Sequence, residues 1–194
     1  KIYSSNILSK KTMATNKTKI LSNSRELFEQ YGYQKTTLTD IAKSVGKVKT
    51  AIYYYFSGKD EIFAELVQTE AEAFNKKLFS KVETANNSID KLELYVTTRM
   101  ELMQQLSERY NFLKLDFFEL MPIVEENRSE SDKKEIAYVT SILEEINKSN
   151  EAEIIDVTFS AKMLINTLKG LEVQMYVTDQ IVIPKKEKEQ FKNF

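Results

Sequence analysis

Residues that interrupt helices are scarce in this chain, and two of them lie close together near its N-terminus. The 194 residues include four glycines and two prolines, which favours long helices over sheets. Gly32 and Gly46 enclose a short stretch in which apolar residues recur at helical spacing. We therefore expect an all-α protein whose first part is a helix, a turn and a second, shorter helix.

The first two helices are bounded by specific signals. Apolar residues at helical spacing predict a helix over 18–31, and Gly32 suits the left-handed residue that ends a helix. Thr37 and Asp40 have the spacing of a capping box, so the second helix should begin after Thr37. Its apolar stripe ends at Gly46 and consists of Leu38, Ile41, Ala42 and Val45.

A third helix is expected to present polar side chains outward. Val48, Ile52 and Phe56 recur every four residues and should be buried, and Ser57 with Asp60 predicts a second capping box. Three short helices around a small core suit the insertion of one helix into a DNA groove. The opposite face of the third helix carries Lys49, Thr50, Tyr53 and Tyr54.

This segment resembles the N-terminal domain of the TetR/AcrR family of transcriptional regulators. The resemblance rests on Leu27-Phe28, Gly32-Tyr33, Thr36-Thr37, Ile41-Ala42, Gly46, Tyr53, Tyr55-Phe56 and Lys59-Asp60. It implies a helix-turn-helix DNA-binding domain over 13–58 and a helical-bundle ligand-binding and dimerisation domain over 59–194, with about nine helices in all. Such proteins are homodimers, usually repressors that leave a palindromic operator when a small molecule binds.

Three positions depart from the family pattern. The family places an apolar residue straight after the turn glycine and a small capping residue next, where this chain has Lys47 and Val48. The missing side-chain cap weakens the third helix by about 1 kcal/mol. Ala51 stands where the family commonly has a threonine that contacts phosphate. We therefore expect a locally rearranged turn and an operator sequence of its own.

Charge is divided unevenly along the chain. Residues 1–58 hold 10 Lys and Arg against 3 Asp and Glu, and the remaining residues hold 18 against 26. A basic head on an acidic body suits DNA binding, because phosphate contacts supply much of the affinity; the alternative is a chance imbalance on solvated faces. Two of the candidates below have alternative roles: Tyr53 packed partly in the core, and Lys47 as a solvated side chain without a DNA contact. The candidate DNA contacts are Thr37, Thr39, Lys47, Lys49, Thr50, Tyr53, Tyr54 and Lys59.

Several functional classes are disfavoured by composition. The chain has no cysteine and no histidine, which excludes disulfides and thiolate sites and removes the commonest general base and metal ligand. It has no phosphate-binding glycine loop, and no apolar run approaches the length of a membrane span. We expect a soluble cytoplasmic protein, without metal or cofactor, that is not an enzyme.

The rest of the chain is predicted to be helical. Residues 1–12 precede Met13-Ala14-Thr15, which has the form of a start, and are expected to be a disordered extension, or a basic arm bearing Lys10, Lys11 and Lys17. Pro122 should kink one helix, and 127–132 should be a polar break. The expected helices cover 59–81, 88–107, 109–128, 133–148 and 156–178.

Two sets of residues in the body are assigned to binding. A mainly hydrophobic pocket is predicted from large apolar side chains, although such residues are more often core: Tyr95, Met100, Met103, Phe117, Phe118, Met121, Phe159, Met163 and Tyr176. Asp116 and Glu119 either meet a cationic ligand group or face solvent. The resemblance implies a four-helix bundle between two copies, unless these stripes complete the core of one protomer. Its residues are Ile136, Val139, Leu143, Phe159, Met163, Asn166, Gly170 and Gln174.

The leading functional interpretation is a ligand-responsive DNA-binding regulator. It would be a homodimeric repressor on a palindromic site in double-stranded DNA, released by a small, mainly hydrophobic effector and independent of membranes. The alternative is a helical-bundle module that binds other proteins and no DNA.

Overall fold

The computed structural model describes residues 2–114 and 116–177, and within these ranges every regular element is a helix. The all-α class is confirmed, with fewer helices in the described ranges than expected for the whole chain. None of these helices is both long and apolar enough to span a membrane. The elements are α1 (Ile2–Tyr31), α2 (Leu38–Ser44), α3 (Lys49–Ile52), α4 (Lys59–Val82), α5 (Ser88–Arg109), the 3-10 helix η1 (Asn111–Lys114), α6 (Phe117–Lys148) and α7 (Val157–Val177).

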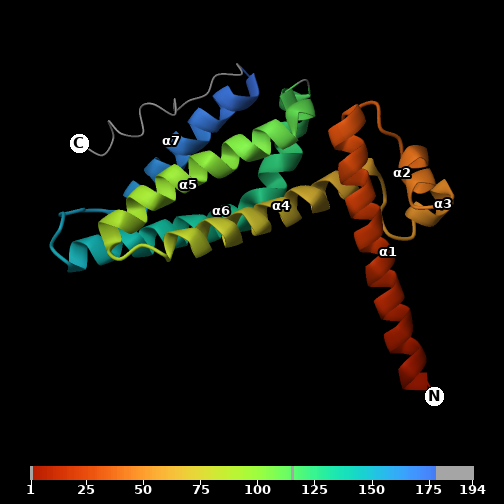
Figure 1. Ribbon diagram of the computed structural model, residues 1–194, viewed down its shortest axis with the longest axis horizontal. Coiled ribbons are helices and arrows are strands. Elements are labelled where there is room, and N and C mark those ends of the chain that lie inside the picture. Colours follow the sequence, from red (N-terminus) through yellow and green to blue (C-terminus); the bar gives the residue numbers. More distant parts are fainter. Residues whose placement is uncertain (1, 115, 178–194) are drawn as a thin grey trace.

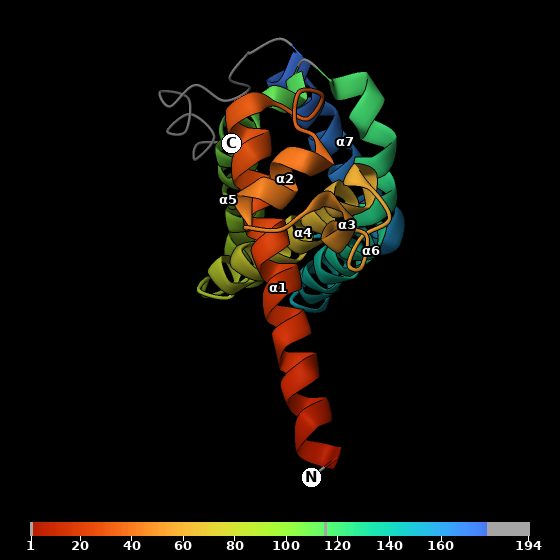
Figure 2. The same ribbon diagram turned by 90° about the vertical axis from the view of Figure 1, so that its right-hand side faces the viewer.

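The molecule has a small head and an elongated body (Figure 1). The head consists of α1, α2 and α3, and α1 runs across the direction of the body helices, with its N-terminal end projecting away from them (Figure 2). The body consists of α4 to α7, in which α4 packs against α5 and α6, and α6 against α7. Helix α4 contacts α1 as well, and so does η1, so both elements connect the head to the body.

Two apolar cores follow the same division. The body core gathers residues from α4 to α7, among them Leu78, Tyr95 and Ile142. The head core contains Ile20, Phe28, Ile41 and Ile52. It is completed by side chains from beyond α3, namely Ile62, Phe63, Leu66, Tyr110, Phe112 and Leu120. The head is therefore packed directly onto the near end of the body.

Helix α1 is longer than predicted. It begins at Ile2 and includes residues 2–12, and the expected disorder of 1–12 stays a prediction. No glycine or proline occurs before Gly32 to stop the helix. From Met13 onward its side chains contact the head and α4: Asn16 Nδ2 donates to Tyr55 Oη at 3.2 Å, and Lys17 pairs with Glu65 at 2.5 Å. Lys17 is therefore held against α4.

Helix α6 replaces two predicted helices and the polar break between them. The break at 127–132 is wrong because its polar groups are paired: Asn75 Nδ2 donates to Ser131 O at 2.7 Å, and Arg128 pairs with Asp132 at 3.1 Å. The helix also begins later than position 109, since α5 extends to Arg109 and η1 intervenes. Pro122 lies within α6, which is visibly bent in Figure 1.

The remaining boundaries agree closely with the sequence. The predictions of helices over 59–81, 88–107 and 156–178 correspond to α4, α5 and α7, each within a few residues. The charged run 185–190, whose sequence predicts the beginning of another helix after Pro184, lies outside the described residues.

Candidate DNA-binding surface and ligand cavity

The turn before α2 contains the predicted capping box. Thr37 Oγ1 accepts a hydrogen bond from Asp40 N at 3.2 Å, and Thr37 N donates to Asp40 Oδ2 at 3.0 Å. These bonds from Thr37 hold the pKa of the Asp40 carboxyl below its usual value. The start of α2 is therefore fixed by two side chains that the sequence identified.

One glycine follows the end of α1 and another follows the end of α2. Gly32 has φ 85° and Gly46 has φ 68°, a left-handed conformation that other residues adopt only at a cost. After Gly46, Lys47 N donates to Ala42 O at 2.8 Å, which turns the chain back over the end of α2. The turn that separates the two helices of the motif is thus set by Gly46.

Helix α3 has four residues and is anchored by one apolar side. Ile52 and Phe56 are buried, as predicted. Val48 is not: its side chain is 69% exposed, because Val48 is the extended N-cap residue and its side chain precedes the first turn. The predicted absence of a side-chain cap at this position is confirmed. Helix α3 is therefore preceded by an exposed valine that the sequence assigned to the core.

The outer face of α3 and its following turn is polar and exposed. Tyr53 is 50% exposed and Tyr54 is 67% exposed. Lys49 and Thr50 lie on the same exposed stretch, and Lys49 Nζ lies 5.9 Å from the centre of the Tyr53 ring. The Tyr54 hydroxyl donates to Met13 Sδ at 3.6 Å, so this side chain bridges α1 and the turn.

The other candidate contacts surround this face. Thr37 and Thr39 are exposed at the start of α2, and Lys47 is half-buried in the turn. Lys59 instead points inward: its Nζ donates to Tyr33 O at 2.8 Å and lies 4.0 Å from the centre of the Tyr33 ring. Burial lowers the pKa of Lys59. Its charge is engaged in holding the head together.

The second predicted capping box does not form. Gly58 is the N-cap of α4 and makes no side-chain bond. Ser57 N donates to Glu61 Oε2 at 2.5 Å, one residue later than predicted. Asp60, the expected partner, accepts a hydrogen bond from the Tyr33 hydroxyl instead. The sequence pattern was misassigned because a long-range partner competes for Asp60.

A cavity of about 290 Å³ lies among α4, α5, α6 and α7, next to the head. Of the predicted pocket residues, Met103, Phe117, Met121 and Tyr176 line it. Tyr95 and Met100 are wrong, because they are buried in the body core. Phe118 is also wrong: it is 83% exposed, since the later start of α6 turns it outward.

The remaining two predicted pocket residues belong to an outer surface. Phe159 and Met163 are exposed on α7, at 60% and 49% respectively, and do not line the cavity. Gly170 is exposed on the same helix, and a Cβ added there would meet no atom within 4 Å. Asn166 and Gln174 are exposed as well. This set of five is called the α7 face.

The α6 residues of the predicted dimer interface pack inside the protomer. Val139 and Leu143 are buried in the body core, and Ile136 packs against it. Val139 and Leu143 are therefore covered within the protomer by neighbouring helices, whereas Ile136 is half-buried and its place in an interface stays a prediction.

One wall of the cavity belongs to the head core. Phe28 of α1 and Phe63 and Leu66 of α4 line the cavity and are also members of the head core. Phe28 and Phe63 meet edge to face, with ring centres 6.0 Å apart. A molecule in the cavity would therefore touch side chains that hold the head in place.

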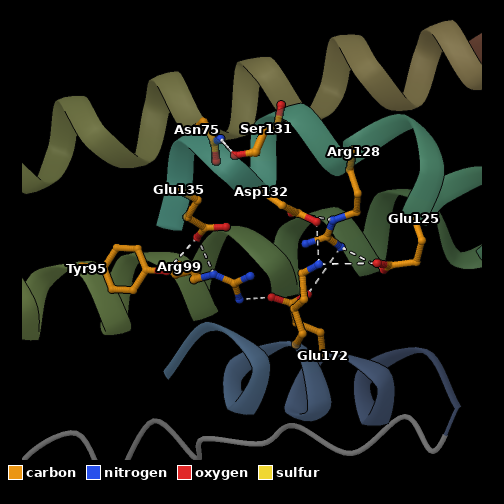
Figure 3. Close-up of polar contacts among 10 residues, drawn as sticks. Asn75, Tyr95, Arg99, Glu125, Arg128, Ser131, Asp132, Glu135 and Glu172 are labelled. Carbon is orange, nitrogen blue, oxygen red and sulfur yellow. Dashed lines mark hydrogen bonds and ion pairs between the residues drawn. The ribbon is translucent and has the colours of Figure 1, made fainter. Parts of the chain in front are cut away.

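Another part of the cavity lining is charged, and Figure 3 shows the ion pairs of these residues. Arg99 is fully buried and pairs with Glu135 at 2.7 Å and with Glu172. The Tyr95 hydroxyl donates to the same oxygen of Glu135 at 2.8 Å, and burial raises the pKa of Tyr95. Glu135 and Glu172 line the cavity, whereas Arg99 is not a lining residue.

A second group of ion pairs continues this wall. Lys169 pairs with Asp132 at 2.6 Å and with Glu125 at 3.4 Å. Arg128 pairs with Asp132 at 3.1 Å and lies 3.8 Å from Glu172. We call the seven residues the charged wall: Arg99, Glu125, Arg128, Asp132, Glu135, Lys169 and Glu172.

The sequence analysis missed the charged wall. Arg128, Asp132, Glu135 and Val139 recur at intervals of three and four residues and continue the apolar stripe of α6 without interruption. That spacing could have revealed one helix with a polar buried face. Polarity was taken as a sign of a loop instead.

The head matches a described family. Residues 20–66 match the model of bacterial regulatory proteins of the tetR family. Over this range the chain is similar to that family. The matched range covers the predicted motif and the beginning of α4.

Curated relatives are similar over about half of the chain. The Staphylococcus aureus (strain Newman) protein described as the biofilm operon icaADBC HTH-type negative transcriptional regulator IcaR is 36% identical over 94 residues. Its counterpart in Staphylococcus epidermidis is 35% identical over 94 residues. Each alignment covers 48% of this chain and 49% of the relative, so the chain spans about half the length of the curated relatives it matches.

Solved structures resemble a larger share of the chain. The regulator FadR of Bacillus subtilis, in complex with stearoyl-CoA, has a TM-score of 0.65 at 21% identity and covers 84% of this chain and 88% of its own. A TetR/AcrR-family regulator from Thermobifida fusca has a TM-score of 0.67 at 20% identity, covering 92% and 93%. At these identities the likeness shows the fold, head and body together.

Proposed function

We propose that this protein is a DNA-binding transcriptional repressor of the tetR family. The observation that carries the proposal is the exposed face of α3, where Lys49, Thr50, Tyr53 and Tyr54 stand on a segment anchored by buried Ile52. Such a segment has the form needed to enter a major groove, with hydroxyl and ammonium donors for bases and phosphates. The likeness to IcaR, a negative regulator, favours repression.

We infer that the working unit is a homodimer assembled through the α7 face. Phe159 and Met163 expose apolar surface there, and Gly170 permits close approach of a second helix. Two-fold symmetry would place two heads about 34–36 Å apart, one turn of B-DNA, on a palindromic site. The protein would act in the cytoplasm on double-stranded DNA and without catalysis.

Ligand response is proposed from the shared wall of the cavity. Because Phe28 and Phe63 belong both to the cavity and to the head core, a ligand that displaces them changes the position of the head relative to α4. The apolar lining supports a small, mainly hydrophobic effector. The stearoyl-CoA complex of Bacillus subtilis FadR supports ligand binding by this fold.

DNA binding is tested by selecting fragments from a genomic library and measuring affinity for the enriched site at several salt concentrations. Lys49→Ala should weaken binding and reduce the slope of log affinity against log salt by about 1 for each lost phosphate contact. Lys148→Ala, an exposed lysine at the far end of α6, is the matched control. Failure to enrich any fragment would favour the protein-interaction module instead.

The dimer is tested by sedimentation. Phe159→Glu should shift the protein to monomer and abolish binding to the full palindrome. Ile155→Glu changes an isoleucine that is 99% exposed just before α7, and should leave the dimer intact. Equal sedimentation of Phe159→Glu and the unsubstituted chain would contradict the assignment of the α7 face.

A further inference from the structure

We propose that the cavity binds amphipathic organic cations, with the cationic group at the charged wall and the apolar part against the head. This inference rests on the proposed ligand response and names the chemical class of the effector. The charged wall and the apolar wall occur in one cavity, so a ligand must satisfy both.

The charged wall has an excess of carboxylates. Its seven residues comprise three cations and four carboxylates, a net of one negative charge. Glu70 lines the cavity too, but it pairs with Arg25 at 2.8 Å and with Arg109 at 3.6 Å, so it is not counted in this excess. A positive group entering this space meets an environment that favours it, and a negative group meets repulsion.

The cations of this wall are already engaged. Lys169 bridges Asp132 and Glu125, and Arg128 is held by Asp132 and approaches Glu172. An anionic ligand would have to break these pairs to reach either side chain. Arg99 Nη2 has no hydrogen-bond partner among the described residues, but Arg99 does not line the cavity.

Carboxylate oxygens are more available. Glu135 accepts its bonds from Arg99 and Tyr95 at Oε1, and in Figure 3 its other oxygen carries no dashed contact. Glu135 itself lines the cavity. A desolvated carboxylate oxygen beside the cavity is a strong acceptor for an ammonium group.

Aromatic faces complete the site. Phe117 and Tyr176 stack at 5.9 Å between ring centres, and both line the cavity. Burial raises the pKa of Tyr176 to about 12, so this ring stays neutral at physiological pH. Neutral aromatic faces attract organic cations, especially quaternary ammonium groups. The volume of about 290 Å³ limits the ligand to a small molecule.

The test compares three ligands with the same alkyl chain: octyltrimethylammonium, octanoate and octan-1-ol. Their affinities for the full-length protein are measured by titration calorimetry, below the concentrations at which they aggregate. The cation should bind about tenfold more tightly than either of the others. Equal or tighter binding of octanoate, or no binding of the cation, overturns the proposal.

Substitutions in the cavity test whether the ligands bind there. Glu125→Gln should lower the cation-to-octanoate affinity ratio several-fold, because it removes a carboxylate and loosens Lys169. Glu126→Gln, an exposed neighbour on α6 that does not line the cavity, is the matched control. Val124→Trp, at a half-buried lining residue, should fill the cavity and abolish binding of all three ligands. An unchanged ratio in Glu125→Gln, with the protein shown to be folded by circular dichroism, overturns the proposal.

The experiments can contradict the proposed ligand class and the proposed function independently of each other. DNA binding is measured without ligand, and ligand binding without DNA. Preference for octanoate in a protein that binds its DNA site overturns the ligand class alone. Tight binding of the cation in a protein that enriches no DNA supports the ligand class and contradicts the proposed function.

Discussion

The head and the body bury polar groups in different ways. In the head the buried polar residues are Ser24 and Thr36, neutral hydroxyl side chains. The body buries Arg99, Glu135 and Glu172, which carry charge. Neutral groups need one or two local hydrogen bonds, whereas buried charges need partners from other helices. The turns and the first capping box of the head are thus specified by local sequence, whereas the buried charges of the body depend on pairings between distant segments.

The largest effect is expected from breaking the buried pairs in the body. Arg99→Met leaves Glu135 and Glu172 without their cation and should lower the free energy of unfolding by about 3–5 kcal/mol. The free energy of unfolding is measured by urea denaturation, followed by circular dichroism. Lys133→Met, which removes an exposed pair with Glu130 on α6, should give no measurable change. Equal effects of the two variants would mean that the charged wall does not stabilise the body.

In the head, the largest loss of stability should come from truncating a buried apolar side chain. Ile52→Ala removes the buried anchor of α3 and should cost about 3 kcal/mol of unfolding free energy, with loss of DNA binding. Ile155→Ala, at the exposed position before α7, is the control for the same change of side chain. If Ile52→Ala retained full DNA affinity, α3 would not be the recognition segment.

A smaller effect is expected at the capping box. Thr37→Ala should destabilise the head by about 1 kcal/mol at neutral pH. Because the pKa of Asp40 is lowered in the folded head, the stabilisation is present above the unfolded-state pKa and disappears as pH falls through the folded-state value. Denaturation at pH 7 and near pH 3 should therefore show the variant losing less stability in acid than the unsubstituted protein. Parallel pH profiles would contradict this assignment.

The smallest expected change in stability is an increase. Val48→Ser supplies the side-chain cap that α3 lacks and should raise stability by about 0.5 kcal/mol. Val48→Ala, which provides no cap, separates capping from the removal of an exposed apolar group. Thermal unfolding of the three proteins measures the difference. A gain in both variants would show that exposure of Val48, not capping, limits the head.

The same division explains what the sequence predicted. Gly32, Gly46 and the Thr37–Asp40 box were correct because turns and caps depend on residues a few positions apart. The Ser57–Asp60 box failed because Tyr33, far away in sequence, takes Asp60. Arg128 and Asp132 were assigned to a loop because their partners lie on α7. Local rules are sufficient only where the interactions are local.

The wall shared by the cavity and the head limits how a new specificity can arise. In the regulator proposed above, a substitution at Phe28 or Phe63 that admits a different effector would also alter the packing of the head, so ligand binding and DNA affinity without ligand would change together. Glu125 and Val173 line the cavity but lie outside the head core. Under the proposed function, substitutions at these two positions would change ligand specificity and leave DNA affinity unaltered.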